Sequence, residues 1–363
     1  LLPPTEYSLV QNAFFTDPND QSAWFYYRWL LGRADRPETI SCLYASFKEQ
    51  RVVVGFSRAI NVLSEPGLLL LMVDNRPVPS HWHTPDNRNK HSHVWLCELP
   101  VGTLNTRFEE QSVRVLWGEG HVAKECYCMD RGRGEGWSRD SATDEQLFRC
   151  ELSVQKSTVL QSELESCKQL QELEPGNKWC VLTVILLMRA LDPLGYEQET
   201  LRYFQTLRAA DPVREAYFAD LRSRYLVENA VLKMEYAETR VIQLAEKELT
   251  TLCHLDQLLL VTHMNLSGNR LKSLPLQFAG MQCLEVLHAD DNEIESIAGL
   301  CNLPKLEVVS LRENRLRDPA DLRPLASCPR LSVLMLAGNP LCQEEDVAQA
   351  LSSLLPGVEE IVT

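Results

Sequence analysis

The spacing of apolar residues changes several times along the chain. In residues 1–33, apolar and aromatic residues recur every three or four positions, which is the period of an amphipathic helix. From Pro37 they form short runs separated by turn residues, which is typical of β-strands. Helical spacing returns near Thr158. The last part of the chain repeats one short frame, so the pattern predicts helical, strand-rich, helical and repetitive parts in that order.

The repetitive part is built around four asparagines. Each of them follows one apolar residue by five positions and a second by three, and the frames recur every 22 to 25 residues, at Asn269, Asn292, Asn314 and Asn339. This spacing predicts a leucine-rich repeat array. Each unit then contributes a short strand whose apolar side chains enter a stacked core, while the asparagine turns inward to bond backbone groups. A helix over Asp346–Leu355 is expected to cap the array.

The residues between the core positions of these strands would form a concave binding face. They are Thr262, His263, His288, Asp290, Ser310 and Arg312. This set is polar, mixes both signs of charge and contains no aromatic anchor. The sequence therefore does not name a ligand for the face, and an array that only caps the helical part remains an alternative.

The strand-rich part predicts a β-sandwich of the immunoglobulin-like type. Its runs of β-branched and aromatic residues are Ile40–Phe47, Arg51–Phe56, Leu68–Val73, His93–Leu99, Val113–Trp117 and Leu147–Val154. The Cys–Trp–Cys spacing of antibody domains is missing, so we expect a sandwich without a disulfide. We interpret the glycine-rich stretch Arg131–Gly136 as a loop, because no Lys-Ser or Lys-Thr pair follows to build a phosphate site.

The first helical part contains an aromatic motif that begins with Asp17-Pro18-Asn19. We expect Pro18 in the first turn of a helix with Asp17 as its N-cap. Trp24, Tyr27 and Arg28 then share one helical face. An ordinary amphipathic helix with an aromatic core stripe would explain the motif equally well. Residues 158–235 show the same Pro-punctuated helical hairpins, so the sandwich is predicted to interrupt a helical domain.

Composition and charge exclude some classes of function. The 363 residues carry a net charge of −14, which disfavours a nucleic-acid surface. No apolar run approaches the roughly 20 residues that span a bilayer. The 12 cysteines are scattered singly, which is typical of reduced thiols and a cytoplasmic protein. The chain opens inside ordered-looking sequence without an initiator Met, and we expect it to be the C-terminal portion of a longer subunit.

The sequence contains few candidate metal-binding or catalytic residues. The pairs His81-x-His83 and His91-x-His93, with Cys97 and Cys126-x-Cys128 nearby, could bind a metal. The surrounding Pro, Asp and Asn residues favour an exposed hairpin tip instead. No nucleophile elbow, phosphate loop or metalloprotease helix occurs. We therefore assign no catalytic, cofactor-binding or metal residue, and treat the marked positions as a structural repeat motif: Pro18, Asn19, Trp24, Arg28, Asn269, Asn292, Asn314 and Asn339.

The motif from Pro18 through Trp24 to Arg28 resembles the tandem repeat of protein prenyltransferase α subunits. A degenerate echo at Pro175 and Trp179 lacks two residues between Pro and Trp and has no matching Tyr. A helical array that is interrupted by an immunoglobulin-like domain and followed by leucine-rich repeats is similar to the α subunits of Rab geranylgeranyltransferases. The resemblance covers the whole chain, and relative to such a subunit the earlier helical repeats are missing.

This resemblance implies a multidomain α+β fold. Its parts are a helical prenyltransferase-α repeat at 1–36, an immunoglobulin-like insert at 37–155, further helical repeats at 156–236, and leucine-rich repeats with a C-terminal cap at 237–363. We expect the sandwich and the array to be appended modules with independent cores.

The resemblance also implies function. The chain would be a non-catalytic or accessory α subunit of a heterodimer that transfers geranylgeranyl groups from geranylgeranyl diphosphate to C-terminal cysteines of Rab GTPases. A Rab escort protein would present the Rab, and zinc would be bound by the partner β subunit, with no cofactor in this chain. The helical part is the expected docking surface for both proteins. A leucine-rich-repeat adaptor without a prenylation role, or an enzyme that acts alone, are the alternatives.

Overall fold

The computed structural model describes residues 4–31, 38–64, 67–105, 111–118, 122–128, 132–139, 157–237, 240–343 and 346–363. The chain divides into two compact units. The helical unit takes residues 1–36 and 145–229, and the second unit takes residues 37–144 and 230–363. The four-part division expected from the sequence stays a prediction. Its boundaries at 36/37 and 155/156 lie outside the described residues, whereas residue 236 lies inside a helix.

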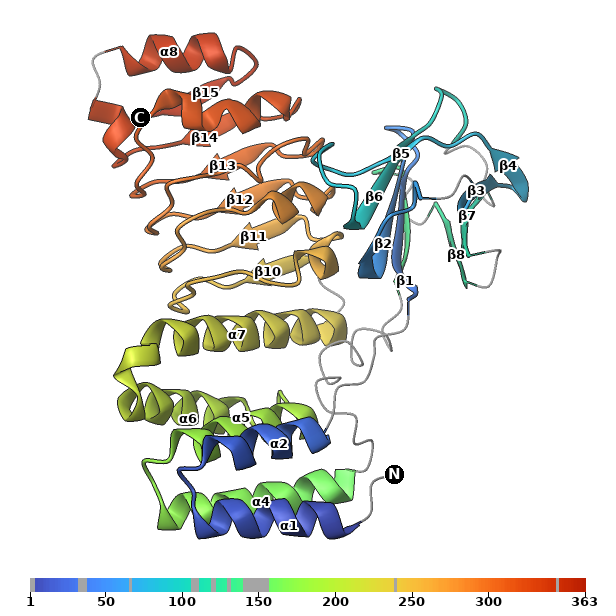
Figure 1. Ribbon diagram of the computed structural model, residues 1–363. Coiled ribbons are helices and arrows are strands. Elements are labelled where there is room, and N and C mark those ends of the chain that lie inside the picture. Colours follow the sequence, from blue (N-terminus) through green and yellow to red (C-terminus); the bar gives the residue numbers. More distant parts are fainter. Residues whose placement is uncertain are drawn as a thin grey trace. The chain divides into compact units, whose positions relative to one another are not determined.

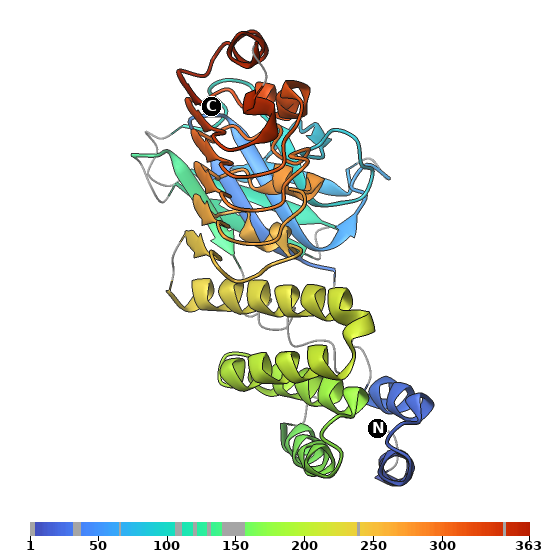
Figure 2. The same ribbon diagram turned by 90° about the vertical axis from the view of Figure 1, so that its left-hand side faces the viewer.

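The helical unit is built from antiparallel hairpins. Its helices are α1 (Pro4–Thr16), α2 (Gln21–Leu31), α4 (Ser157–Leu173), α5 (Lys178–Leu191), α6 (Glu197–Ala210), the 3-10 turn η1 (Pro212–Arg214) and the start of α7 (Glu215–Ala237). The hairpins α1–α2 and α4–α5 lie next to each other (Figures 1 and 2). They share one core in which the side chains of Phe14, Trp24 and Tyr27 are completely buried.

The start of α2 differs from the expectation. The Asp17 carboxylate accepts a hydrogen bond from the Asn19 amide at 3.1 Å, and Pro18 lies in this turn between the helices. Asp20 performs the capping role, because its carboxylate accepts from the Ser22 amide at 2.9 Å. The prediction of Asp17 as N-cap was therefore wrong. Pro18 suits the second position of a turn as well as the first turn of a helix, so the sequence alone did not separate the two.

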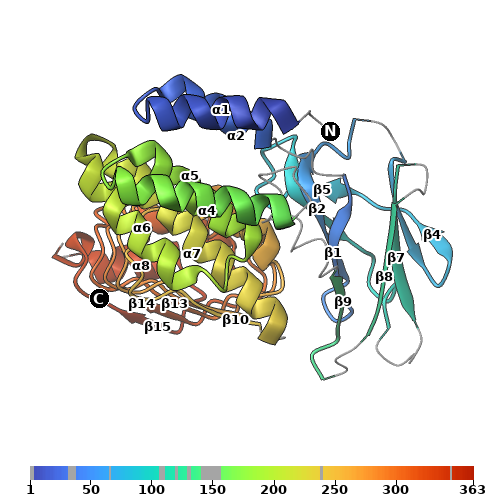
Figure 3. The same ribbon diagram turned by 90° about the horizontal axis from the view of Figure 1, so that it is seen from below.

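The insert, residues 37–144 of the second unit, forms two antiparallel sheets (Figure 3). One sheet has the order β5-β6-β2-β1-β9 and the other β4-β3-β7-β8. The strands are β1 (Ile40–Ser46), β2 (Arg51–Ile60), β3 (Leu69–Val73), β4 (Arg76–Val78), β5 (Trp82–His83), β6 (Ser92–Glu98), β7 (Ser112–Trp117), β8 (Val122–Tyr127) and β9 (Glu135–Arg139). The immunoglobulin-like type stays a prediction, and the strand expected over Leu147–Val154 lies outside the described residues.

The glycine-rich stretch is only partly a loop. Residues 132–134 form a turn, but Glu135 and Gly136 open β9, so the interpretation of the whole stretch as a loop was wrong. A Cβ atom at Gly136 would lie 2.0 Å from the Tyr127 carbonyl oxygen. The glycine thus lets the end of β8 approach β9 closely. A glycine in a strand commonly marks such an approach of two backbones.

The array stacks parallel strands in the order β10 to β15 (Figure 1). They are β10 (Val241–Gln243), β11 (His263–Asn265), β12 (Val286–His288), β13 (Val308–Ser310), β14 (Val333–Met335) and β15 (Glu360–Val362). Each strand pairs in register with the next. The 3-10 turns η2 (Leu255–Leu258), η3 (Leu276–Gly280), η4 (Pro319–Ser327) and η5 (Pro340–Gln343) lie between the strands, and α8 (Val347–Leu354) agrees with the expected terminal helix.

The insert has a core of its own between its two sheets, and it shares a second core with the array. The expectation of modules whose cores are wholly independent was therefore only partly right. Tyr44, Val53 and Leu96 of the insert pack with Leu259 and Cys283 of the array. This shared core contains charge, which is expensive to bury unless it is paired. The consequence is that the insert is attached to the repeats over an apolar and ionic surface.

The charged part of this surface is centred on Glu135, whose side chain is 2% exposed. Its carboxylate accepts a hydrogen bond from the Lys305 ammonium and a second one from Arg240 at 2.8 Å. Lys305 also donates to the Tyr44 hydroxyl at 2.5 Å. Burial acts to raise the pKa of Glu135, but the hydrogen bonds from Lys305 and Arg240 lower it below its ordinary value.

Candidate functional site

The aromatic motif of α2 lies in the core of the helical unit. Trp24 stacks on Phe14 with ring centroids 4.3 Å apart, and its Nε1–H donates to the Pro18 carbonyl at 2.9 Å. Tyr27 donates its hydroxyl to Glu163 of α4. Burial, followed by the neighbouring Cys167 and Glu163, raises the pKa of Tyr27 far above its ordinary value. Trp24 and Tyr27 therefore hold hairpins together and are not available to a substrate.

The echo of the motif continues this joint. Asn177 caps α5, because its side-chain oxygen accepts from the amides of Trp179 at 3.1 Å and Cys180 at 3.0 Å. Its amide nitrogen donates to the same Pro18 carbonyl that Trp24 uses, at 2.5 Å. Pro18 thus joins the two hairpins through its carbonyl oxygen. The exposed Asn19 contributes its backbone amide to the turn at Asp17.

An aromatic–cationic surface covers the outer side of this joint, and we define it as Phe25, Arg28, Lys178, Trp179 and Arg214. The Phe25 ring is 51% exposed and lies 5.8 Å from the Trp179 ring. The Arg28 guanidinium carbon is 4.7 Å from the centroid of Phe25 and 5.7 Å from that of Trp179. Lys178 and Arg214 also lie against Trp179, at 5.3 and 5.9 Å. Three cations and two aromatic rings therefore meet at one place.

One acidic residue balances part of this charge. The Asp211 carboxylate accepts from Lys178 at 2.7 Å and also pairs with Arg214. The hydrogen bond from Lys178, together with that from Arg214, lowers the pKa of Asp211. Burial lowers the pKa of Arg28, and one of its guanidinium nitrogens, Nη2, has no hydrogen-bond acceptor among the described residues. The surface keeps a positive balance beside the exposed Phe25 ring, and aromatic residues and arginine are enriched in protein–protein interfaces.

The thiols of the helical core are not nucleophiles. Burial raises the pKa of Cys180 to about 12, and the Cys180 thiol donates to the Cys167 carbonyl at 3.1 Å. Burial also raises the pKa of Cys167 well above its ordinary value. Both thiols stay protonated at neutral pH, and a thiolate is the reactive form. This core is therefore suited to packing rather than to covalent catalysis.

The histidines of the insert do not assemble into a metal site. His91 and His93 line a hollow of about 450 Å³ together with Asp86 and Asp256. The Nδ1 atom of His93 lies 3.3 Å from the Phe56 carbonyl oxygen and 3.9 Å from Asp256. Among the described residues, none of the insert histidines belongs to a group of three metal-ligand side chains at binding distance. The same holds for Cys97, Cys126 and Cys128, none of which forms a disulfide.

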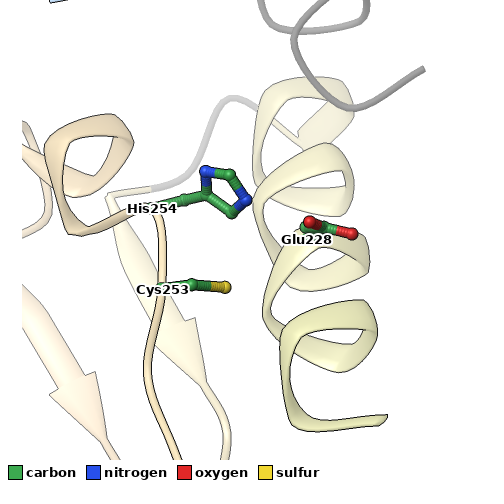
Figure 4. A group of neighbouring side chains, drawn as sticks. All are labelled: Glu228, Cys253 and His254. Carbon is green, nitrogen blue, oxygen red and sulfur yellow. The ribbon is translucent and has the colours of Figure 1, made fainter. Parts of the chain in front are cut away.

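Three further side chains with ligand chemistry are drawn in Figure 4. Glu228 is on α7 and belongs to the helical unit, where its carboxylate pairs with the Arg189 guanidinium at 2.6 Å. Cys253 and His254 belong to the second unit and precede η2. The His254 backbone has φ 54°, in the left-handed region, and its carbonyl accepts from the Gln257 amide at 2.9 Å. We assign structural roles to Glu228 and His254.

The four repeat asparagines form a ladder of identical contacts. Asn292 accepts a hydrogen bond from the Leu271 amide at 3.1 Å and donates to the Leu266 carbonyl at 3.0 Å, so it joins consecutive repeats. Asn269, Asn314 and Asn339 make the equivalent bonds. All four are at most 8% exposed. They satisfy buried backbone groups and leave no polar atom for a ligand.

Sequence reasoning placed Trp24 and the asparagines but missed most of the aromatic–cationic surface. Phe25 lies outside the face of α2 that carries Trp24 and Tyr27, and the helical period could have marked it. Lys178 and Arg214 come from helices that are distant in sequence. Their meeting around Trp179 depends on the packing of the hairpins.

Two protein families match parts of the chain. The family described as Rab geranylgeranyl transferase alpha-subunit, insert domain, matches residues 40–142, and the protein prenyltransferase alpha subunit repeat matches residues 3–34. The first match covers the insert, and the second covers α1 and α2 with the aromatic motif. The matched segments therefore belong to different units of the structure.

Among curated proteins, the chain is similar to geranylgeranyl transferase type-2 subunit alpha. The proteins of Pongo abelii and Homo sapiens are each 63% identical to it over 358 residues, which is 99% of this chain and 63% of the relative. The chain thus spans about 63% of the length of these relatives. A shorter match, 41% over 64 residues, links 18% of the chain to leucine-rich repeat-containing protein 56 of Homo sapiens, of which it covers 12%.

Proposed function

We propose that this chain, which is similar over 99% of its length to geranylgeranyl transferase type-2 α subunits, works as the α subunit of a heterodimeric protein prenyltransferase. The enzyme transfers geranylgeranyl groups from geranylgeranyl diphosphate to C-terminal cysteines of Rab GTPases that an escort protein presents. The alternative of a freestanding repeat adaptor is not favoured, since the similarity includes the helical unit and the insert as well as the repeats.

In this proposal the partner β subunit supplies the zinc, the lipid pocket and most reactive groups. Zinc bound there would activate the acceptor cysteine as a thiolate. The chemistry of this chain supports that division of labour. Burial raises the pKa of the thiols in the helical core, which disfavours the reactive thiolate there. The role of this chain is to bind and position its partners.

The observation that carries the proposal furthest is the aromatic–cationic surface. Phe25 is half exposed although its ring lies tilted against that of Trp179, and Tyr217 of α7, a neighbour of Arg28, is 56% exposed. Exposed aromatic rings beside arginine are enriched in the centres of protein interfaces. We propose that this surface docks the β subunit, with Arg28 and Lys178 facing acidic residues of the partner. The escort protein binds elsewhere on the helical unit.

We further propose that the protein works in the cytoplasm. None of the 11 cysteines among the described residues forms a disulfide, which suits a reducing compartment. None of the described helices is long and apolar enough to cross a membrane.

The test compares two exposed phenylalanines of neighbouring helices. Phe25→Ala removes the ring that contacts Trp179, and Phe15→Ala removes a 41% exposed ring of α1 as the matched control. Each variant of the chain is titrated with the type-2 geranylgeranyl transferase β subunit by calorimetry. We expect Phe25→Ala to weaken the complex roughly 30-fold, the size of an interface hot spot. Phe15→Ala should change it less than about threefold.

Circular dichroism of both variants controls for folding. Equal losses for the two variants would assign the β-subunit interface to another surface. Failure of the unaltered chain to bind the β subunit at all would contradict the proposed function itself.

A further inference from the structure

The outer face of the repeat sheet carries an apolar row with an acidic row beside it. Strand pairing places Val241, His263, Val286, Val308 and Val333 side by side on successive strands. The residues that follow them, such as Leu287 and Val309, are completely buried in the array. Neighbouring residues of a strand face opposite sides, so the valine row points to the outer, concave face.

Three glutamates, Glu285, Glu307 and Glu359, stand immediately before the strands β12, β13 and β15 and form the acidic row. The same position before β10, β11 and β14 is taken by Arg240, Thr262 and Ser332. Backbone hydrogen bonds run from Glu307 to Glu285, from Ser332 to Glu307 and from Glu359 to Ser332, so these residues also lie side by side. Glu307 and Glu359 are exposed, and the structure gives them no cationic partner among the described residues. Glu360 extends the valine row with a further carboxylate on β15.

One of these carboxylates already binds a cation. Arg133 of the insert pairs with Glu285 at 2.7 Å, and its side chain remains 47% exposed. A guanidinium group can therefore reach the acidic row and bond to it. Because the whole chain carries a net charge of −14, the general field also attracts a positive partner.

The spacing of the two rows indicates the shape of the partner. Successive strands lie about 4.8 Å apart, which is close to the ~5.4 Å rise of one helical turn. An extended segment would instead present alternate side chains about 6.7 Å apart, which does not match the strands. A helix that crosses the strands can therefore place one apolar residue per turn on each valine, and one basic residue per turn on the acidic row.

We propose that the concave face of the array binds a basic amphipathic α-helix of a partner protein. The apolar stripe of that helix lies on Val241, Val286, Val308 and Val333, and its Lys or Arg stripe faces Glu285, Glu307 and Glu359. The row from β10 to β14 crosses four strand spacings. At ~4.8 Å each this is about 19 Å, the length of roughly 13 helical residues.

The experiment uses the full chain and a labelled synthetic peptide of about 16 residues, with one leucine and one arginine stripe on adjacent faces. Binding is measured by fluorescence anisotropy. Two further peptides have the same composition. In the first, the two stripes lie on opposite faces. In the second, a terminal proline of the designed peptide exchanges places with a central residue, which breaks the helix.

The matched protein variants are Glu307→Lys on the acidic row and Glu295→Lys, an exposed glutamate outside the strands. Both change the net charge equally. We expect Glu307→Lys to weaken binding roughly tenfold and Glu295→Lys less than twofold. Both rearranged peptides should bind at least tenfold more weakly than the designed one.

Three outcomes overturn the proposal. Equal weakening by the two variants means that only the general negative charge attracts the peptide. Equal binding of the helix-breaking peptide means that the face accepts an extended segment. No binding of the designed peptide removes the face as a site for such a helix.

Discussion

Two joints in this protein connect segments that are distant in sequence, and they use opposite chemistry. In the helical unit, the Pro18 carbonyl accepts neutral hydrogen bonds from Trp24 and Asn177 within an aromatic core. Between the insert and the array, Glu135 is buried between Lys305 and Arg240. The first joint relies on shape and burial of apolar surface. The second relies on charges that are favourable only while every partner is in place.

The difference bears on how each joint responds to change. A neutral joint loses stability in proportion to the apolar volume that is removed. A buried ionic joint reacts strongly to the loss of one partner, because the remaining charges stay buried without compensation. It also depends on pH, whereas the bonds to Pro18 contain no titrating group. The following predictions probe this contrast.

The largest effect is expected at the neutral joint. Trp24→Ala removes a completely buried indole that stacks on Phe14, and we expect a loss of about 3 to 5 kcal/mol in the free energy of unfolding of the helical unit. Hydrogen exchange measured by mass spectrometry should show the loss of protection in α1, α2, α4 and α5. Unchanged protection there would mean that α2 does not depend on its aromatic core.

A loss of about 3 kcal/mol is expected at the ionic joint. Glu135→Ala leaves the buried Lys305 ammonium and the partly exposed Arg240 guanidinium without the carboxylate that they share. The matched control is Glu49→Ala, which breaks the more exposed pair with Arg330 and should cost less than about 1 kcal/mol. The loss of stability of both variants is measured by unfolding in urea, with hydrogen exchange of the amides in β9 and β10 as the signal. Similar small losses would show that the Glu135 pairs add little to the attachment of the insert.

The smallest effect is a pH dependence at the same joint. The pKa of Glu135 is lowered in the folded protein, so its contribution is complete above the unfolded carboxyl pKa of about 4.3 and disappears as pH falls through the folded value. Each pKa unit by which the folded value lies below the unfolded value corresponds to about 1.4 kcal/mol of unfolding free energy. Comparing the unaltered chain with Glu135→Ala from pH 6 to 3 should therefore show a difference that shrinks on acidification. A constant difference would contradict the ionic account, and the Trp24→Ala difference serves as the pH-independent reference.

The sequence predicted those features that repeat locally. The asparagine frames gave the array because each unit carries the same pattern, and the helical period placed Trp24 and Tyr27 in the core of α2. The strands β4 and β5 were missed because three and two residues are too few to show a period. The longer β8 was missed because the charged residues Lys124 and Glu125 interrupt its apolar residues. The capping role of Asp20 was missed because Asp17 stands before a proline in an equally favourable pattern.

The ionic joint was missed for another reason, which is the distance of its residues in sequence. Glu135 follows a run of glycines, and Lys305 stands between Pro304 and Leu306, where its neighbours suggest a repeat core. They are 170 positions apart in sequence. Nothing local marks them as partners. The aromatic–cationic surface also depends on such distant contacts, with Arg28 and Arg214 meeting only at Trp179.

The asparagine ladder also restricts how this part of the gene can change its length over evolution. Each repeat asparagine bonds to the preceding repeat in the same way. A duplication or deletion of one whole repeat therefore preserves these hydrogen bonds, while a partial repeat breaks them. The insert adds a second restriction. Arg51 and Glu49 of the insert bond to Gln282 and Arg330 of the array, and the Asn302 side chain of the array donates to the Pro85 carbonyl of the insert. Repeats between these positions are fixed in number, and related genes should gain or lose units only beyond Arg330.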